Sequence, residues 1–387
     1  MLNSLQRQIL GAINSAAGLS RTELAQFCRM SKAAISSPVR EMLEAGYLFE
    51  ADSINGPGQG RPSVKLMIRP QGAYFIGVSL LQEPAQMALI NLNGEIIARA
   101  CFALNRDPTL LAENIAHALP ELLDGQAEAA ERLMGMGVTL SGFIDETQSI
   151  CVQSALLGWR NVALATLITQ ATGLEVFIEN DAKALAVSEK RFGQARDLET
   201  FTLVSHGAGI GSAHFIAGKL HRGLHGGAGE IAHCTMELNG TPCRCGKRGC
   251  LDTIASVNAI MEMAREENLT IASLPELERL AANGQAAAIR ILHRAGSALG
   301  LGIAHLIQII DPSLILIAWQ EETIDGLLGT VVQQSIETNV LPGFAGLTPV
   351  RTFAINQDTW VRAAASIAAH RFLDGPESIN DGAKSAR

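Results

Sequence analysis

The sequence predicts an α/β protein in which an N-terminal winged helix-turn-helix precedes a larger body of two lobes. Three observations predict this fold. Residues 1–70 show three short amphipathic helical patterns and then a strand, a glycine-rich loop and a strand. Residues 71–387 show two rounds of a strand meander followed by alternating helices and strands. The first segment carries eight Lys/Arg against five Asp/Glu and the second carries 22 against 33, so a basic head precedes an acidic body.

Composition restricts the class of protein. The chain has 387 residues, is 48% hydrophobic and carries a net charge of −8, which suits a globular protein with sizeable cores. We expect an amphipathic helix at the start, over residues 1–13, and no secretory signal. The longest apolar stretch, residues 298–310, contains His305 and Gln308 and is too short to span a bilayer. The sequence therefore predicts a soluble cytoplasmic protein without a membrane partner.

The first two helices of the head follow from apolar spacing and capping. Leu5, Ile9 and Ile13 recur at helical intervals and predict the first helix. Ser20, with Glu23 three residues later, forms the pattern of a capping box at the start of the second. The first helix therefore presents one apolar face, and the second begins at a defined residue.

The third helix is expected to begin at Ser31 and to end at Gly46, a typical position for a terminating glycine. Only a few residues separate it from the second helix, as in a helix-turn-helix. Pro38 falls well inside the pattern, where a missing N–H costs about 3 kcal/mol. Either the helix kinks there, or Ser37 caps a new start with Pro38 in its first turn.

A hairpin with a glycine-rich loop follows the three helices. Residues 47–50 and 64–68 are the expected strands, and the loop between them resembles the wing of a winged helix. A three-helix bundle with an appended hairpin fits the same pattern, but the short turn and the basic charge favour DNA binding. The positions expected to contact double-stranded operator DNA are Ser31, Lys32, Ala33, Ser36, Ser37 and Arg40 on the third helix and Arg61 by the wing.

The body contains two comparable series of elements. We expect the first series to comprise strands over 74–81, 87–92 and 96–102, helix over 109–134, strand over 134–140, helix over 160–172 and strand over 174–178. We expect the second to begin with a strand at 201 and to include helices over 253–310, a strand over 314–318 and a helix over 359–372. The repeated order predicts two lobes with a cleft between them.

Three of the seven cysteines fall within eight residues. Cys243, Cys245 and Cys250 surround a short glycine-containing turn, and His233 precedes them. Three thiolates and one imidazole make a complete tetrahedral zinc set, with Cys234 as a competing fourth ligand. The alternative is a group of buried structural thiols. The close spacing favours a closed structural Zn²⁺ site without an open position for water.

A second glycine cluster, residues 206–211, follows a predicted strand. Backbone N–H groups in such a loop can bind phosphate, but glycine-rich hairpins are common and neither a P-loop lysine nor its serine follows. Asn180-Asp181 also follows a strand, where the residues alone indicate no more than a helix cap.

Two segments together resemble the repressor/open-reading-frame/sugar-kinase family, known as ROK. The family signature, Glu-x-Gly-His and then Cys-x-Cys-Gly-x-x-Gly-Cys-x-Glu, stands here as residues 230–233 and 243–252. Ala232 replaces the glycine and Asp252 the glutamate. Residues 158–161 and 179–182 also look like family motifs. The resemblance extends from the winged helix to about residue 372 and implies an actin-like fold of the hexokinase superfamily, with a zinc site beside a sugar pocket.

The resemblance also implies a set of sugar-binding residues. In the family's kinases the aspartate matching Asp181 takes the sugar hydroxyl proton, and the residues matching Glu230 and His233 contact the hydroxyls. Buried hydroxyls need such partners. The positions expected to bind a sugar or sugar-phosphate effector are Gly142, Asn180, Asp181, Glu230, His233 and Asp252.

The chain departs from the family's kinases where phosphate is handled. The kinases carry Asp-x-Gly-Gly-Thr in the first hairpin, and residues 79–83 here contain neither aspartate nor glycine. The kinases carry glycines after the late strand, and residues 318–320 here are Ala-Trp-Gln. Ala208 stands where Gly-Thr-Gly is usual. Because phosphoryl transfer depends on positioning phosphates, we expect no kinase activity.

The sequence therefore predicts a sugar-responsive transcriptional regulator, a repressor more often than an activator, acting as a homo-oligomer, either a dimer or a tetramer. Two alternatives remain: an active sugar kinase with an accessory DNA-binding head, and a regulator controlled by a protein partner. Residues 79–83 disfavour the first, and retention of Asn180, Asp181, Glu230 and His233 disfavours the second.

Overall fold

The computed structural model describes the chain except residues 1, 17, 52–63, 321–325 and 376–387. It divides into two compact units. Unit 1 comprises Met1–Asp197 and Trp360–Arg387, and unit 2 comprises Leu198–Thr359. None of the described helices is both long enough and apolar enough to cross a membrane.

Unit 1 begins with a winged helix-turn-helix. Its elements are α1 (Ser4–Ser15), β1 (Leu19–Ser20), α2 (Arg21–Phe27), α3 (Lys32–Glu44), β2 (Leu48–Ala51) and β3 (Lys65–Ile68). The strands form an antiparallel sheet in the order β1-β3-β2. The capping box of Ser20 and Glu23 is present at α2, and Gly46 ends α3 with a φ of +79°. Local capping chemistry therefore determines these boundaries.

Helix α3 continues unbroken through Pro38. Ser31 caps it, its side-chain oxygen accepting from the Ala34 N–H at 3.2 Å. The alternative of a new start at Ser37 is therefore wrong. Ile35 and Val39 are both fully buried. Burial of each such side chain contributes roughly 1.5–3 kcal/mol, which together offset the roughly 3 kcal/mol cost of an interior proline.

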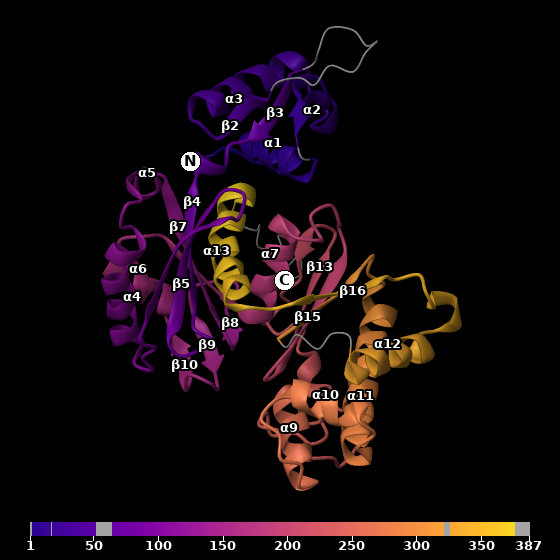
Figure 1. The fold of residues 1–387 in the computed structure, drawn as a ribbon. Coiled ribbons are helices and arrows are strands. Elements are labelled where there is room, and N and C mark those ends of the chain that lie inside the picture. The colour runs from indigo at the N-terminus through magenta and orange to yellow at the C-terminus, as the bar shows by residue number, and fades with distance from the viewer. Residues whose placement is uncertain (1, 17, 52–63, 321–325, 376–387) are drawn as a thin grey trace, which may run out of the picture. The chain divides into compact units, whose positions relative to one another are not determined.

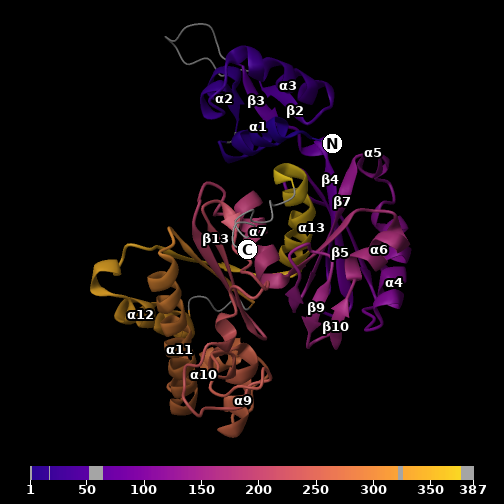
Figure 2. The ribbon, with the colours of Figure 1, turned by 180° about the vertical axis from the view of Figure 1, so that it is seen from behind.

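The rest of unit 1 is a five-stranded sheet covered on both faces. The sheet order is β11-β7-β4-β5-β6, with an antiparallel meander of β4, β5 and β6 and parallel β7 and β11. Figures 1 and 2 show α4 and α6 on one face and α7 and α13 on the other. The bounds are η1 (Pro70–Gly72), β4 (Tyr74–Ser79), β5 (Ala85–Asn91), β6 (Ile96–Phe102), α4 (Pro108–Leu122), α5 (Ala127–Glu131), β7 (Leu133–Leu140), α6 (Leu164–Thr172), β11 (Val176–Asn180), α7 (Asp181–Phe192) and α13 (Gln357–Asp374).

Helix α13 lies unusually close to the sheet. A Cβ built on Gly77 of β4 would lie 2.0 Å from the Val361 carbonyl oxygen, and one on Gly137 of β7 would lie 1.9 Å from that of Ala364. Real side chains cannot occupy such positions, so glycine is required at both crossings. The two glycines thereby fix α13 against the middle of the sheet.

A small sheet in unit 1 corrects one predicted helix. Its order is β10-β9-β8, formed by Trp159–Val162, Cys151–Ser154 and Phe143–Ile144. The helix expected over 160–172 begins only at Leu164. Trp159 is buried and pairs with Ser154, so pairing with a distant strand overrides the local helical pattern.

Unit 2 repeats the sheet topology of unit 1. Its sheet order is β14-β13-β12-β15-β16, again an antiparallel meander with two parallel strands added beside its first member. Helices pack Leu299 and Ile303 against Ile315 and Ile317 of the sheet. The elements are β12 (Phe201–His206), β13 (Ile210–Ile216), β14 (Lys219–Leu220), η2 (Ile231–His233), α8 (Asp252–Ala255), α9 (Val257–Glu266), α10 (Leu274–Ala282), α11 (Ala286–Ile310), β15 (Ile315–Trp319), α12 (Leu327–Asn339), η3 (Pro342–Phe344) and β16 (Val350–Ala354).

The duplicated sheet confirms the predicted actin-like class. The two rounds of meander and alternation seen in the sequence correspond to the two five-stranded sheets. Each sheet buries its own hydrophobic cluster, one on Val78 and Val138 in unit 1 and one on Val204 and Ile317 in unit 2.

Candidate functional site

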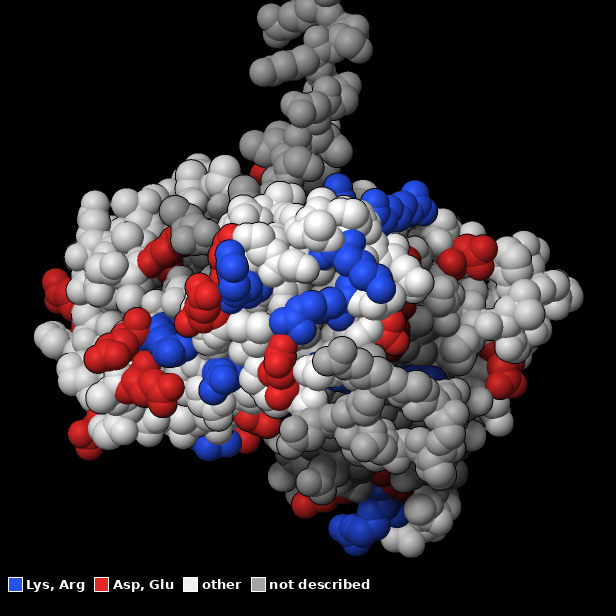
Figure 3. Space-filling model, turned by 90° about the horizontal axis from the view of Figure 1, so that it is seen from above, with Lys and Arg blue, Asp and Glu red and all other residues white. Residues whose placement is uncertain are grey.

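The predicted DNA-contacting positions of α3 form one exposed face. Ile35, Val39 and Met42 point into the core, and every helical position predicted to contact DNA is exposed. Those positions are Ser31, Lys32, Ala33, Ser36, Ser37 and Arg40. Figure 3 shows Lys and Arg side chains gathered near the middle of the face seen from above. Arg61 lies outside the described residues.

Several of these side chains already have partners within α3. The Ser36 hydroxyl donates to the Lys32 carbonyl at 2.7 Å, and that of Ser37 donates to Glu41 at 3.1 Å. Arg40 lies 3.9 Å from Glu44, with both side chains 71% exposed. An ion pair this open contributes little to stability, so Arg40 can exchange its carboxylate partner for a phosphate at small cost.

The four predicted metal ligands converge in unit 2. The Nδ1 or Nε2 of His233 and the Sγ atoms of Cys243, Cys245 and Cys250 all lie within 4.8 Å of one another. His233 Nδ1 is 3.6 Å from Cys243 Sγ, and Cys245 Sγ is 3.6 Å from Cys250 Sγ. Ligand atoms about 2.3 Å from a tetrahedral zinc are about 3.7 Å apart, so this donor set fits zinc.

The turn that carries the thiols requires its glycines. Gly249 has a φ of +66°, and a Cβ on it would lie 1.7 Å from the Glu237 carbonyl oxygen. The Cys243 N–H donates to the Lys247 carbonyl at 2.8 Å, which closes the turn. Cys234 is exposed and lies outside the group of four. The geometry therefore favours His233 over Cys234 as the fourth ligand.

The thiols and imidazole differ in how readily they lose a proton. The Lys247 backbone N–H donates to Cys245 and lowers its pKa. Burial, together with the neighbouring thiols, raises the pKa of Cys250 to about 12. Burial lowers the pKa of His233, which favours the neutral, metal-ligating imidazole. A cation bound by all four residues would therefore displace protons from the thiols.

The positions of unit 1 that are predicted to bind sugar lie together at the start of α7. The Asn180 side chain caps this helix, accepting from the Lys183 N–H at 3.2 Å, and its Nδ2 donates to the Gly142 carbonyl at 3.3 Å. Asp181 begins the helix, and its Oδ1 accepts from the Ala182 N–H at 2.9 Å. Loss of solvent raises the pKa of Asp181. Gly142, Asn180 and Asp181 therefore form one polar group.

The positions of unit 2 that are predicted to bind sugar lie beside the predicted metal ligands. Glu230 immediately precedes η2, which ends at His233. Gly229 holds this segment against β13, because the Ser212 hydroxyl donates to its carbonyl at 2.7 Å. Asp252 lies 3.6 Å from Arg244, and its Oδ1 is buried with no hydrogen-bond partner among the described residues. A buried oxygen without a partner is costly, so this carboxylate retains an unused capacity to accept a hydrogen bond.

The glycine loop after β12 is occupied by a side chain of the protein itself. The Ala208 N–H donates to Gln320 Oε1 at 2.9 Å, so an amide oxygen takes a donor that a phosphate would use. The Trp319 ring meets His206 edge-on, with centroids 4.7 Å apart. The residues expected to crowd the nucleotide therefore close the loop. No local sequence pattern indicates the Gln320 hydrogen bond, since the two residues are 112 positions apart.

The first hairpin of unit 1 is equally unlike a phosphate site. Leu80 is fully buried, and the Glu83 carboxylate accepts from the Leu104 N–H at 2.9 Å. The one acidic side chain of residues 79–83 therefore already has a structural partner. Neither this hairpin nor the closed glycine loop retains the kinases' means of holding phosphate.

Comparisons with known proteins agree with this geometry. The sequence model of the ROK family matches residues 75–370, and that of the MarR family matches residues 2–56. The xylose repressor of Bacillus spizizenii is 25% identical over 370 residues, covering 95% of this chain and 96% of the repressor. The DNA-binding transcriptional repressor Mlc of Escherichia coli is 28% identical over 362 residues, covering 89% of this chain and 88% of Mlc.

A solved structure matches both parts of the chain. The crystal structure of a ROK family transcriptional regulator, described as a homolog of E. coli Mlc, superimposes with a TM-score of 0.82. It is 25% identical in sequence, and the match covers 96% of each chain. Since the ROK family model alone spans residues 75–370, the chain belongs to the ROK family.

Proposed function

We propose that this protein is a sugar-responsive transcriptional repressor of carbohydrate-metabolism genes. The supporting observation is the joining of a winged helix, whose α3 presents one exposed face, to a ROK body whose glycine loop is closed by Gln320. The similar xylose repressor and Mlc are named as repressors and not as kinases. The protein thus retains an exposed recognition helix for DNA and lacks the phosphate-holding loops of the family's kinases.

In the proposed mechanism, the side chains of Asn180, Asp181, Glu230 and His233 bind hydroxyls of a sugar or sugar phosphate. Gly142 and Asp252 complete this set of six. Sugar binding selects one arrangement of the body, and operator binding selects another. Each ligand weakens the other by the same factor, because coupling between two binding sites is reciprocal.

We further propose that His233, Cys243, Cys245 and Cys250 hold one zinc ion. When bound, zinc would cross-link this turn through its four metal–ligand bonds. It would have no catalytic role, because four protein ligands leave no open coordination position for water or substrate. The ligand His233 adjoins the segment that carries Glu230. The cross-link would thereby hold a sugar-binding carboxylate in place.

We also propose that the protein binds DNA as a homodimer through residues 1–70, with residues 71–387 as the effector domain. Winged helices that act in pairs recognise two half-sites, so the operator should be palindromic. Arg61 is proposed to contact the minor groove beside the α3 face.

The test of function begins with the DNA. Purified full-length protein selects duplexes from a random pool. The complex with the selected duplex is then titrated with D-xylose, D-glucose, N-acetyl-D-glucosamine and the 6-phosphates of the two hexoses. We expect one of these compounds to release the duplex. Failure to select any palindromic duplex would contradict the proposal.

Two further measurements separate the alternatives. A coupled ATPase assay with the same compounds should show no turnover, and formation of a phosphorylated sugar would restore the kinase hypothesis. Calorimetry should show direct binding of the releasing compound. A protein that selects DNA but binds none of the compounds would instead favour control by a protein partner.

A further inference from the structure

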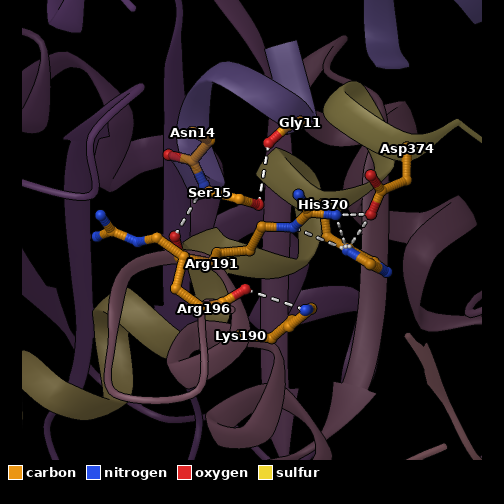
Figure 4. A network of polar contacts seen from close by, with 8 residues as sticks. All are labelled: Gly11, Asn14, Ser15, Lys190, Arg191, Arg196, His370 and Asp374. Carbon is orange, nitrogen blue, oxygen red and sulfur yellow. Dashed lines mark hydrogen bonds and ion pairs between the residues drawn. The ribbon is translucent and has the colours of Figure 1, made fainter. Parts of the chain in front are cut away.

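Helix α7 connects the proposed sugar-binding residues to the winged helix within unit 1. Its first residue is Asp181, and Asn180 caps its N-terminus. At the other end, the Asn14 side chain of α1 donates to the Arg191 carbonyl at 3.2 Å (Figure 4). The last carbonyls of a helix have no partner within it, so they need donors from elsewhere. The winged helix supplies one of them.

The other groups at this end of α7 are fixed by the body. The Arg196 guanidinium donates to the Phe192 carbonyl at 3.2 Å, and the Lys190 ammonium donates to the Arg196 carbonyl at 3.0 Å. The Gln194 N–H donates to the Glu189 carboxylate at 2.9 Å. Asn14 therefore contacts a well-ordered C-terminal end of α7. A displacement of α7 would move the Arg191 carbonyl, and with it the hydrogen bond to Asn14.

The middle of α7 is packed in a way that lets a shift at its first residue move its last. Leu185, Ala186 and Val187 in its middle are all buried, and the helix has twelve residues, a length of about 18 Å. A helix buried on most sides moves as one piece, because its hydrogen bonds and its packing cannot change separately. A shift at Asp181 would therefore appear at Arg191.

A buried ion cluster links α7 to the helix beside it. Arg191 is 9% exposed, forms an ion pair with Asp374 of α13 and donates from Nε to His370 Nδ1 at 3.0 Å. His370 Nδ1 lies 2.8 Å from Asp374. Burial lowers the pKa of Arg191 to about 10, which still leaves it charged at neutral pH. The charge holds the ends of α7 and α13 together.

Helix α1 contacts α13 as well. A Cβ on Gly375, directly after α13, would lie 2.2 Å from the Arg7 guanidinium, so Gly375 and the Arg7 side chain lie in contact. Leu373 of α13 lies in one hydrophobic cluster with Ile9 and Ile13 of α1. The three helices thus form a closed set of contacts, α1 with α7, α7 with α13 and α13 with α1.

We infer that α7 transmits sugar binding to the winged helix, and that the hydrogen bond from Asn14 to the Arg191 carbonyl is the contact through which it does so. This inference rests on the proposed function. A sugar that binds at the start of α7 would shift the helix and, through Asn14, the orientation of α1 and the recognition helix packed on it. Asn14 and Arg191 are positioning residues and touch neither DNA nor sugar.

The test uses Asn14→Leu in the full-length protein, which removes the donor while keeping the same number and branching of side-chain heavy atoms. Ser15→Ala is the matched control, because Ser15 is exposed and its hydroxyl donates only to the Gly11 carbonyl of its own helix. For each protein the affinity for the selected duplex is measured with and without the releasing compound from the panel of D-xylose, D-glucose, N-acetyl-D-glucosamine and the hexose 6-phosphates.

In Asn14→Leu the ratio of these two affinities should fall by about three- to tenfold, the size expected for one hydrogen bond. Affinity for the compound alone should stay within about twofold of wild type, since Asn14 contacts the end of α7 opposite Asp181, about 18 Å along the helix. A merely structural role would lower both duplex affinities together and leave the ratio unchanged. An unchanged ratio in Asn14→Leu overturns the inference.

A second measurement uses the duplex alone. Amide hydrogen exchange over residues 190–196 should slow when wild type binds the duplex, and this slowing should be lost in Asn14→Leu but kept in Ser15→Ala. Equal slowing in all three proteins overturns the inference even when no panel compound releases the DNA. A wild type that selects no duplex overturns the proposed function and the inference with it, whereas normal release in both variants overturns the inference alone.

Discussion

At the scale of single residues, the cysteine spacing predicts the proposed zinc ligands except for one choice. Three cysteines in eight residues indicate a metal without any knowledge of the fold, because a chain this short must bring them together. His233 and Cys234 are neighbours in sequence, so their spacing from the three cysteines cannot decide between them. In the structure the His233 imidazole lies with the three thiols, whereas the Cys234 side chain is exposed.

The proposed zinc is tested by its removal. Purified protein should carry about one zinc per chain, and Cys245→Ser should lose it and unfold at lower temperature, because metal binding contributes directly to folding. Elemental analysis and thermal unfolding measure the two effects. Cys234→Ser is the matched control from the same segment and should keep its zinc. A fully folded, reduced wild type without zinc would contradict the proposal.

The exposed face of α3 predicts a particular salt dependence. Lys32→Ala should weaken binding to the selected duplex and reduce the slope of log affinity against log salt by about one, because one phosphate contact is lost. Arg40→Ala should weaken binding in the same assay. Arg265→Ala, at a 68% exposed arginine of unit 2, is the control and should bind as wild type does. Equal loss in all three variants would indicate a general charge effect.

Asp181 separates sensing from DNA binding. Each hydrogen bond to a charged group contributes roughly 1.5–3 kcal/mol, so Asp181→Ala should weaken sugar binding by about ten- to a hundredfold. Affinity for the duplex without sugar should stay nearly unchanged. Calorimetry with the releasing compound and duplex titration measure the two. If the sugar releases the duplex from Asp181→Ala as readily as from wild type, the sensing site does not lie at the start of α7.

At the scale of elements, local chemistry predicted the boundaries that depend on neighbours in sequence. Ser20, Glu23 and Ser31 cap the expected helices because capping needs only the next three residues. Residues 160–163 were predicted wrongly as helix, because β10 exists only through its pairing with β9. The contact of Asn14 with Arg191 joins residues 177 positions apart, and no sequence pattern indicates it.

The close crossing of α13 and the sheet gives an element-level prediction. Gly137→Ala should lower the melting temperature markedly, since its Cβ would meet the Ala364 carbonyl and overpacking costs about 1–3 kcal/mol or more. Gly11→Ala is the control, because a Cβ there meets nothing within 4 Å and alanine favours a helix by about 1 kcal/mol over glycine. Thermal unfolding by circular dichroism measures both. A Gly137→Ala protein as stable as wild type would show that α13 can move away at little cost.

At the scale of the whole molecule, the sequence predicted the duplicated topology because each round of strands and helices has its own apolar periodicity. It could not show how the winged helix is attached. Ile9, Leu24 and Leu48 of the head share one buried cluster with Phe75 and Leu373 of the body. That cluster draws on both ends of unit 1, and such long-range packing leaves no trace in local patterns.

This shared cluster has a consequence for how such a regulator can change its target. A head transplanted from another protein would have to match Phe75 and Leu373 as well as join the chain at residue 70, so exchange of whole heads would usually leave a poorly packed interior. New operator specificity is obtained at lower cost by substituting the exposed positions of α3, which contribute nothing to that interior. The winged helix and the body should therefore share one evolutionary history, and regulators that combine a head and a body from different lineages should be rare.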